Sequence, residues 1–378
     1  MLNVAVIFGG ASAEHDVAVV SAQQLMDAAD ARRIRVIPVY MDFENRLFTG
    51  PRLRDIAAFR PRPPALSEVR FRWGDDGPEL VDARGTAQPV DCALPVFHGP
   101  FGEDGRIHAL LELVGVPVTG FSASSSAIAM RKDATKTLVK SAGVNVLDHV
   151  AVSRAERADL RGALDAAEAR LGLPVVVKPA NLGSSIGVGL ARSRAEVAAL
   201  LEYVLRLDDL ALIEPQVRNL VEYNIAMMWR DGAVVFSAIE RPKSGAELLD
   251  FREKYLSGGG GAKGALPSEG MLSLTREINP NIPAELTARI HDQARRAFMV
   301  LGARGAPRID FMCDSATGEL WFNEINPIPG SYGFFLWEAA DPPRLYPQLI
   351  DHLVDEARRL SRKRFDDPVP QDAYLLPR

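Results

Sequence analysis

The chain begins with an unbroken apolar run, residues 4–8, that stops at Gly9 and Gly10. A short run of this kind is typical of a parallel strand buried on both faces, so the first region is expected to be an open layer of strands covered by helices. Ser12 is the expected N-cap of the helix that follows. Four apolar residues then keep helical spacing, namely Ala22, Leu25, Met26 and Ala29.

Further strands are expected at residues 36–40 and 93–97, which gives an alternation of strand, helix and strand. The pattern predicts an open parallel α/β domain over residues 1–123. Two stretches between the strands, 61–64 and 74–77, contain the prolines and glycines of predicted loops.

A helix-like segment at residues 124–143 leads into two further regions. In chain order, their expected elements are strands at 174–178 and 186–190, a helix at 195–205, strands at 211–214, 224–229 and 233–239, a helix with its apolar face at 286–301, and a β-hairpin at 308–313 and 319–323. Residues 243–277 lack periodicity, and a loop this long is usually functional or disordered. We therefore predict a small central domain at 124–210, a C-terminal antiparallel-sheet domain at 211–365, and a loose tail at 366–378.

The charge balance and the cysteines exclude several classes of protein. Of the 378 residues, 25% are charged and the formal net charge is −5, which argues against a general nucleic-acid binder. No apolar run approaches the roughly 20 residues that span a bilayer, and no basic segment of a signal peptide precedes the first strand. We therefore expect no membrane partner and a cytoplasmic location. Cys92 and Cys313 are expected to be buried thiols in a reducing compartment.

Oxygen-bearing side chains cluster on the predicted hairpin near the C-terminus. Glu324 and Asn326 alternate along one strand and so share a face, and a turn near Ala316 brings Asp310 to the same face. Mg²⁺ prefers oxygen ligands and usually takes one or two carboxylates together with phosphates. The hairpin alone fits an ordinary solvated surface equally well, because acidic residues are mostly exposed.

A second candidate is the loop after Lys178, which includes Gly183, Ser184 and Ser185. Glycine lets the backbone approach a phosphate closely, while amide and hydroxyl groups donate to it and a lysine supplies charge. The order of residues fits neither the Walker A loop nor the dinucleotide fingerprint. A plain hairpin turn with a lysine at the strand end is the alternative.

Two strand-to-helix turns complete the candidate set. The turn at residues 9–15 carries Glu14, whose carboxylate suits an ammonium group, although acids are common in first helical turns. The turn at residues 98–105 begins with His98 and precedes a predicted helix at 107–114. Ligands bind at such strand ends in open α/β sheets, but a lone histidine is more often structural.

Taken together and in this order, these segments resemble the D-alanine–D-alanine ligase family of the ATP-grasp superfamily. The resemblance runs from residue 4 to about residue 337. It is carried by Phe8-Gly9-Gly10, Ser12-Ala13-Glu14-His15, residues 98–105 (HGPFGEDG), Met130-Arg131-Lys132, Thr135-Lys136, residues 178–187 (KPANLGSSIG), Lys254-Tyr255, Arg308-Ile309-Asp310 and Asn323-Glu324-Ile325-Asn326. The joint order is far more specific than any single segment.

The resemblance implies an α/β protein with a three-domain ATP-grasp fold, in which ATP lies between the central and C-terminal domains. For the nucleotide, it implies phosphate contacts from Lys132, Lys178, Gly183, Ser184 and Ser185, an adenine contact from Glu214, and a ribose contact from Glu222. For the reaction, it implies Mg²⁺ or Mn²⁺ on Asp310, Glu324 and Asn326, the first ammonium group on Glu14, an oxyanion at Arg308 and the backbone of Gly330, and a closing loop with Lys254 and Tyr255.

The implied activity is ATP-dependent joining of two D-alanines through an acyl phosphate, for a peptidoglycan precursor, by a homodimer acting on small molecules. The chain departs from the family pattern twice. The spacing from Glu214 to Glu222 is one residue longer than usual, and Phe335 stands where a small hydroxyl residue is expected to bind the second carboxylate. A lost hydrogen-bond partner discriminates strongly between substrates, so a related ligase with another second substrate is the alternative. A nucleotide-binding protein without catalysis is a third possibility, and the retained lysines and carboxylates argue against it.

Overall fold

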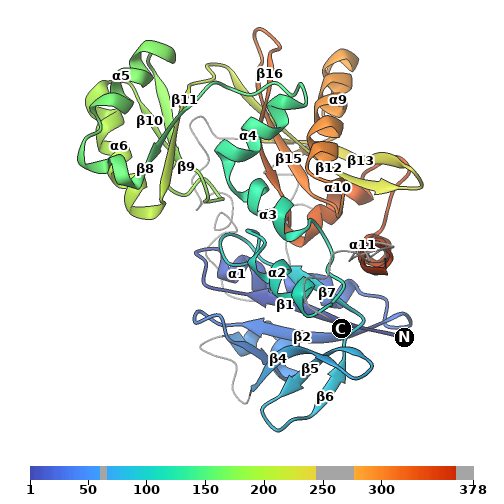
Figure 1. The fold of residues 1–378 in the computed structure, drawn as a ribbon. Coiled ribbons are helices and arrows are strands. Elements are labelled where there is room, and N and C mark those ends of the chain that lie inside the picture. The colour runs from blue at the N-terminus through green and yellow to red at the C-terminus, as the bar shows by residue number, and fades with distance from the viewer. Residues whose placement is uncertain (60–65, 244–275, 363–378) are drawn as a thin grey trace, which may run out of the picture.

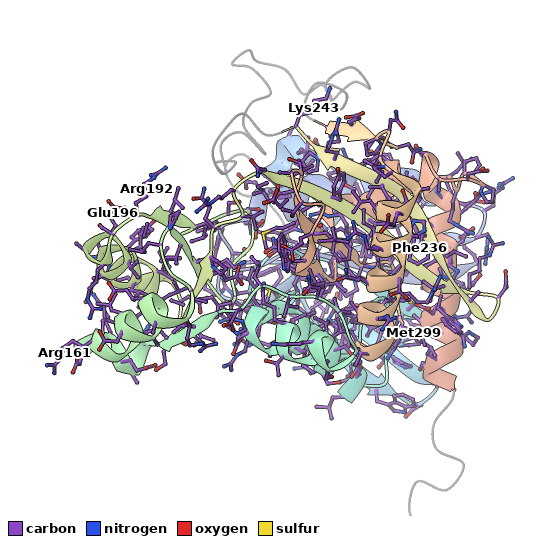
Figure 2. All side chains as sticks on the ribbon, turned by 90° about the horizontal axis from the view of Figure 1, so that it is seen from above. Arg161, Arg192, Glu196, Phe236, Lys243 and Met299 are labelled. Carbon is purple, nitrogen blue, oxygen red and sulfur yellow. The ribbon has the colours of Figure 1, made fainter. Side chains whose placement is uncertain are left out.

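The computed structural model describes residues 1–59, 66–243 and 276–362, and its ribbon is shown in Figure 1. The described strands form three β-sheets, each with its own helices. The N-terminal sheet lies at the bottom of the view, and the central and C-terminal sheets lie side by side above it. Seen from above in Figure 2, Arg161 marks the outer end of the central region, and Phe236 and Met299 lie in the C-terminal region.

The N-terminal sheet has the described strand order β6-β5-β4-β3-β2-β1-β7. Its strands are β1 (Leu2–Gly9), β2 (Ile34–Met41), β3 (Leu47–Thr49), β4 (Ser67–Gly74), β5 (Gly77–Asp82), β6 (Ala87–Pro89) and β7 (Cys92–Val96), and its helical segments are α1 (His15–Ala28), η1 (Pro51–Arg54), η2 (Ile56–Phe59) and α2 (Arg106–Leu113). The three predicted strands are confirmed, and β2, β1 and β7 run parallel as expected. Apolar side chains cover both faces of β1, with α2 packed on one face and α1 on the other.

Two details of this region differ from the sequence prediction. The sheet is mixed, because β3 to β6 extend it as antiparallel strands that were not predicted. Helix α1 begins at His15 with Glu14 in the N-cap position, so the prediction of Ser12 as N-cap is wrong. The Ser12 hydroxyl instead accepts a hydrogen bond from the Glu14 amide at 3.1 Å, which stabilises the turn before the helix.

The central sheet has the described order β10-β9-β11-β8 and packs against two helices. Its elements are β8 (Val150–Ser153), η3 (Arg154–Ala158), α5 (Arg161–Arg170), β9 (Val175–Pro179), β10 (Gly189–Ala191), α6 (Arg194–Leu207) and β11 (Leu210–Pro215). The hairpin of β9 and β10 around the glycine-rich loop is confirmed. Strand β11 had been assigned to the third region, but it pairs with β8 and β9 and belongs here. We keep the three-domain division as a proposal, with the second boundary moved from 210 to after Pro215 and with the helical segment at 124–143 packed on the C-terminal sheet instead of the central one.

The C-terminal sheet has the described order β14-β13-β12-β15-β16. Its elements are α3 (Ala123–Met130), α4 (Lys132–Ser141), β12 (Leu220–Arg230), β13 (Ala233–Pro242), β14 (Arg276–Ile278), α9 (Ala284–Val300), β15 (Arg308–Asp314), β16 (Leu320–Asn326), η4 (Gly330–Gly333), α10 (Phe334–Glu338) and α11 (Tyr346–Arg362). The helix predicted at 124–143 is two helices, because Arg131 is extended between α3 and α4. The predicted β15–β16 hairpin is confirmed.

One face of the C-terminal sheet is apolar and the other carries polar side chains. Ile309, Phe311 and Phe322 point into a core shared with α9, and this alternation leaves Arg308 and Asp310 on the opposite, half-buried face. Both cysteines are buried free thiols, as predicted. Within the described ranges, no helix is long and apolar enough to cross a bilayer.

Candidate active site

The centre of the candidate site is a buried carboxylate, Glu214, held between two ammonium groups. Lys178 on β9 pairs with Leu212 on β11, so the side chains of Lys178 and Glu214 leave the same face of the central sheet. Lys178 Nζ lies 2.8 Å from Glu214 Oε2, and Lys136 Nζ on α4 lies 2.7 Å from Glu214 Oε1. The Lys136 side chain is 0% exposed. Three segments distant in sequence therefore meet at one carboxylate.

The charges in this group do not cancel. Burial alone would raise the pKa of Glu214, but Lys136 and Lys178 outweigh it and hold that pKa at about 2. Burial, opposed by Glu214 and assisted by the other two lysines, lowers the pKa of Lys136 to about 8. A single carboxylate is shared by two ammonium groups, so one positive charge of the group stays uncompensated. The excess positive charge favours a further anion at this place.

Two lysines connect this group to the C-terminal sheet. Lys178 Nζ also donates to Asn323 Oδ1 on β16 at 3.0 Å. Lys132, the first residue of α4, places its Nζ 3.0 Å from Glu324 Oε2 and donates to the Leu182 carbonyl at 2.7 Å. The predicted phosphate-binding lysines therefore lie between the glycine-rich loop and the predicted metal-binding residues.

The predicted metal-binding side chains do converge. In the β15–β16 register, Asp310 lies opposite Glu324, and Arg308 lies opposite Asn326. Asn326 Nδ2 donates to Asp310 Oδ2 at 3.2 Å, and Arg308 donates to the two Asp310 oxygens at 2.6 and 2.7 Å through Nε and Nη2. No group of three His, Cys, Asp or Glu residues suited to a metal occurs in the part of the chain that the structure describes. Two carboxylates and one amide fit Mg²⁺, which takes its remaining ligands from phosphates and water.

The glycine-rich loop lies against the N-terminal domain. Ser184 and Ser185 have left-handed backbone conformations, with φ of 51° and 59°. The Ser184 hydroxyl donates to Glu14 Oε1, which is 170 residues away in sequence. A Cβ at Gly183 would lie only 3.1 Å from Glu14 Oε2, so glycine permits this close approach. The loop and the buried Glu14 carboxylate therefore face one another, as their separate predicted roles require.

The turn at residues 98–105 contributes a second buried acid. Glu103 Oε2 accepts from the Gly99 amide at 2.7 Å, and burial, followed by the nearby Glu14, raises the pKa of Glu103 to about 8. His98 Nε2 lies 3.2 Å from Ser21 Oγ, and burial lowers the pKa of His98 to about 4. Near neutral pH this turn therefore holds a protonated acid and a neutral imidazole beside Glu14.

The structure gives less detail for the other predicted site residues. Glu222 is half-buried on β12, two residues from Asn224, which lies opposite Asp310, so it shares the polar face of the sheet. Gly330 begins η4 and is exposed. Lys254 and Tyr255 lie outside the described residues. The adenine and ribose roles of Glu214 and Glu222 stay predictions.

Phe335, the departure noted in the sequence, packs beneath a cation. The Arg276 guanidinium lies 4.7 Å from the centre of the Phe335 ring. Its Nη1 lies 2.9 Å from Glu240 Oε1, and Asn224 Nδ2 lies 3.3 Å from Glu240 Oε2. Asn224 pairs with both Asp310 and Glu240, so this arginine belongs to the same polar face as the carboxylate cluster.

Sequence reasoning assigned no role to several residues of this site. Lys136 is the clearest case, and its signal was present, because it follows Lys132 by four residues and so shares its face of α4. Asn323 belongs to the segment Asn323-Glu324-Ile325-Asn326, but the sequence predicts no separate role for it. No local motif predicts the contact between Arg276 and Glu240. The pairing of β13 with β14 brings the two residues together, and the undescribed segment 244–275 lies between them in sequence.

The chain matches known proteins over most of its length. The family description "D-ala D-ala ligase N-terminus" matches residues 3–121, and "D-ala D-ala ligase C-terminus" matches residues 138–355. A D-alanine–D-alanine ligase of Synechococcus sp. (strain CC9605) is 34% identical over 368 residues, covering 94% of this chain and 98% of the relative.

Two solved structures have the same fold. The VanG D-Ala:D-Ser ligase of Enterococcus faecalis superposes with a TM-score of 0.78 at 25% identity, over 94% of this chain and 99% of that one. A Bacillus anthracis D-alanine–D-alanine ligase in complex with ATP gives 0.66 at 21% identity, over 96% and 99%.

Three sheets arranged in this way define a ligase of the ATP-grasp class, an ATP-dependent enzyme. The chain belongs to the D-alanine–D-alanine ligase family.

Proposed function

We propose that the protein joins D-alanine to a second amino acid, D-alanine itself being the leading candidate, through an acyl phosphate formed with ATP for a peptidoglycan precursor. The observation that carries the proposal is the pairing of Lys136 and Lys178 with Glu214, next to Lys132, which pairs with Glu324. This excess of positive charge lies beside the Asp310 and Glu324 carboxylates, as transfer of a phosphoryl group requires. Such transfer depends on positioning and charge neutralisation more than on a covalent protein group.

The chemistry has two steps. A carboxylate oxygen of the first amino acid attacks the γ-phosphorus, ADP leaves, and an acyl phosphate forms. The amine of the second amino acid then attacks the acyl carbon, phosphate leaves, and the nitrogen loses a proton. In this scheme Glu14 holds the first ammonium group, and Ser184, which donates to Glu14, positions the loop over the γ-phosphate. Arg308 and the Gly330 backbone are our candidates for stabilising the oxyanion of the second step.

We further propose that Asp310, Glu324 and Asn326 hold Mg²⁺ or Mn²⁺, which supplies charge neutralisation when it is bound. Arg308 and Lys132 neutralise Asp310 and Glu324 in the structure described here. The oxygen atoms of these two carboxylates and of the Asn326 amide, on neighbouring strands beside the lysines, support a site for a divalent cation and phosphates. The ATP complex of the Bacillus anthracis relative supports ATP as the nucleotide.

The identity of the second amino acid has two candidates. The family resemblance favours D-alanine, whereas the Phe335 environment favours a different amino acid or a different mode of binding. Arg276 Nε is buried without a hydrogen-bond partner among the described residues, and it offers a donor for a carboxylate where Phe335 has none. The Enterococcus faecalis neighbour is a D-Ala:D-Ser ligase.

The test measures phosphate release by the purified protein with Mg²⁺-ATP and D-alanine, against a panel of other D- and L-amino acids. Turnover with D-alanine alone, with dipeptide as product, supports the leading candidate and shows that Phe335 is tolerated. Turnover only with a second amino acid retains the ligase chemistry and changes the product. ATP binding without phosphate release from any amino acid contradicts the proposed catalysis. Light scattering in the same samples tests the predicted homodimer.

A further inference from the structure

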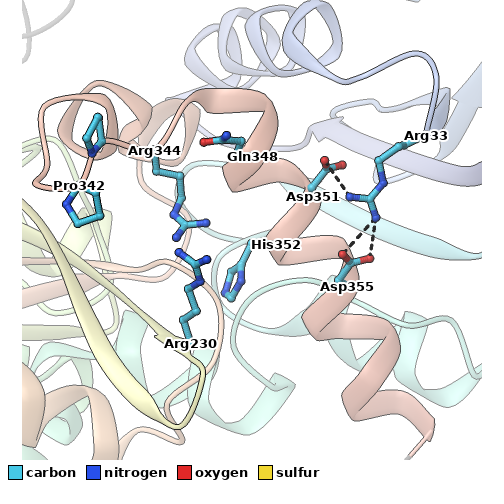
Figure 3. A pocket seen from close by; sticks show the side chains of 9 residues that line it. Arg33, Arg230, Pro342, Arg344, Gln348, Asp351, His352 and Asp355 are labelled. Carbon is cyan, nitrogen blue, oxygen red and sulfur yellow. Dashed lines mark hydrogen bonds and ion pairs between the residues drawn. The ribbon is translucent and has the colours of Figure 1, made fainter.

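A hollow far from the candidate active site brings two arginines together on one side, while its two acids pair with a third arginine on the other side. It has a volume of about 490 Å³ and is lined on one side by Arg230, Arg344 and His352. Figure 3 shows the guanidinium groups of Arg230 and Arg344 directed toward one another, with the imidazole of His352 beside them. Gln348 and the prolines at 342 and 343 complete this side of the wall.

The hollow is separate from the ligase site. Arg33 on its rim precedes β2, where Ile34 lies opposite Leu2, so the rim lies at the amino ends of the parallel strands. The turns that carry Glu14 and His98 follow the opposite, carboxyl ends. Arg230 is the last residue of β12, six positions after Asn224, which lies opposite Asp310. At about 3.3 Å per residue, this places the two sites roughly 20 Å apart along the strand.

The two acids that line the hollow pair with Arg33, and one carboxylate oxygen, Asp351 Oδ1, is buried without a hydrogen-bond partner among the described residues. Asp351 and Asp355 pair with Arg33, at 3.0 and 3.2 Å, on the far side of the hollow in Figure 3. The exposed Asp231 pairs with Arg230 Nε at 3.0 Å. No described residue pairs with the Arg344 guanidinium, and His352 Nε2 is buried without a hydrogen-bond partner among the described residues.

The pKa shifts indicate the same imbalance. Burial, followed by repulsion from Arg230, lowers the pKa of Arg344. Burial, followed by Arg344 and Arg230, lowers the pKa of His352 to about 4, so this imidazole is neutral near pH 7. Two like charges held together in a partly buried hollow are unfavourable by themselves, and an anion between them would remove the repulsion.

We propose that this hollow is a binding site for a tetrahedral oxyanion, phosphate or a phosphate monoester. Two guanidinium forks each match a pair of phosphate oxygens, and His352 Nε2 and the Gln348 amide approach from the helix α11. Donors from three segments of the chain suit an anion with at least three accepting oxygens better than a planar carboxylate with two. The site requires no ligase activity and so stands apart from the proposed function.

Calorimetric titration with inorganic phosphate, at constant ionic strength set by sodium chloride, tests the proposal. The candidate active site also attracts phosphate, so the titration is repeated on Lys178→Met, which weakens only that site. Arg344→Gln and Arg230→Gln alter the hollow. Arg161→Gln is the matched control, because Arg161 is an exposed arginine at the far end of the central region, as Figure 2 shows.

We expect Lys178→Met and Arg161→Gln still to bind phosphate at the hollow. Arg344→Gln and Arg230→Gln should each weaken the affinity of this binding by at least about tenfold, the effect of one charge-assisted bidentate contact. Phosphate should raise the melting temperature of Lys178→Met and leave that of the Lys178→Met, Arg344→Gln double variant unchanged. Phosphate binding that survives both hollow substitutions at full strength, or that disappears with Lys178→Met alone, overturns the proposal.

Discussion

Lys178 Nζ donates to Asn323 Oδ1 at 3.0 Å and so joins the central sheet to the C-terminal sheet across 145 residues of sequence. The same ammonium group lies 2.8 Å from Glu214 Oε2. One side chain therefore contacts both walls of the candidate nucleotide site. Four predictions concern this site and the residues around it.

Replacing Lys178 should impair catalysis more than folding. We expect Lys178→Met to lower kcat by about a hundredfold to a thousandfold, the effect of removing one preorganised charge from a phosphoryl-transfer site. Steady-state kinetics with ATP checks this. Lys140→Met, on the exposed last turn of α4, is the control and should keep full activity. Equal loss in both variants would point to a general effect of charge.

Replacing Lys136 should destabilise the fold. Removing one partner of a buried ion pair typically costs about 3–5 kcal/mol, and we expect the lower end of this range for Lys136→Met because Glu214 keeps Lys178. Urea unfolding measures the change. The double variant Lys136→Met, Glu214→Gln should lose less than the sum of the two single changes, because the substitutions act on one ion-pair network. Additive losses would contradict the ion-pair network.

Glu103 should make stability depend on pH. Its pKa is raised from 4.5 to about 8 on folding, so the folded protein holds a proton that the unfolded chain releases, and stability falls as pH rises from about 4.5 to 8. The isosteric Glu103→Gln removes this fall, which corresponds to about 1.4 kcal/mol per unit of pKa. The free energy of unfolding is measured at pH 5 and at pH 8 for both proteins. The value for Glu103→Gln minus that for the unsubstituted protein should be larger at pH 8 than at pH 5. The opposite shift of His98 is present in both proteins and cancels in the difference.

Glu324 should matter for the metal requirement. We expect Glu324→Gln to keep the melting temperature within a few degrees, to lower kcat by at least about a hundredfold, and to raise the Mg²⁺ concentration needed for half-maximal rate. Glu319→Gln is the control, because Glu319 is exposed at the turn of the same hairpin. Full activity of Glu324→Gln at low Mg²⁺ would remove the metal assignment.

Local patterns in the sequence predicted most of the elements that carry the site. The strand at residues 4–8 and the hairpin of residues 308–326 were predictable from their hydrophobic patterns. A strand buried on both faces is a continuous apolar run, and a strand buried on one face alternates apolar and polar residues. The antiparallel strands β3 to β6 were missed, although Val69 and Phe71 alternate with exposed Glu68, Arg70 and Arg72. This short alternation of buried and exposed residues is the signal from which β4 could have been predicted.

The sequence by itself therefore determined the family, the strand ends on which the candidate residues lie, and the position where Phe335 departs from the pattern. Only the tertiary structure decided that β11 joins the central sheet, that Lys136 and Lys178 share Glu214, and that Arg276 covers Phe335. The physical reason is sequence separation. Periodicity and turn chemistry act between residues a few positions apart. These ion pairs and stacking contacts join residues that are distant in sequence, and sheet pairing and domain packing, which depend on the whole chain, bring them together.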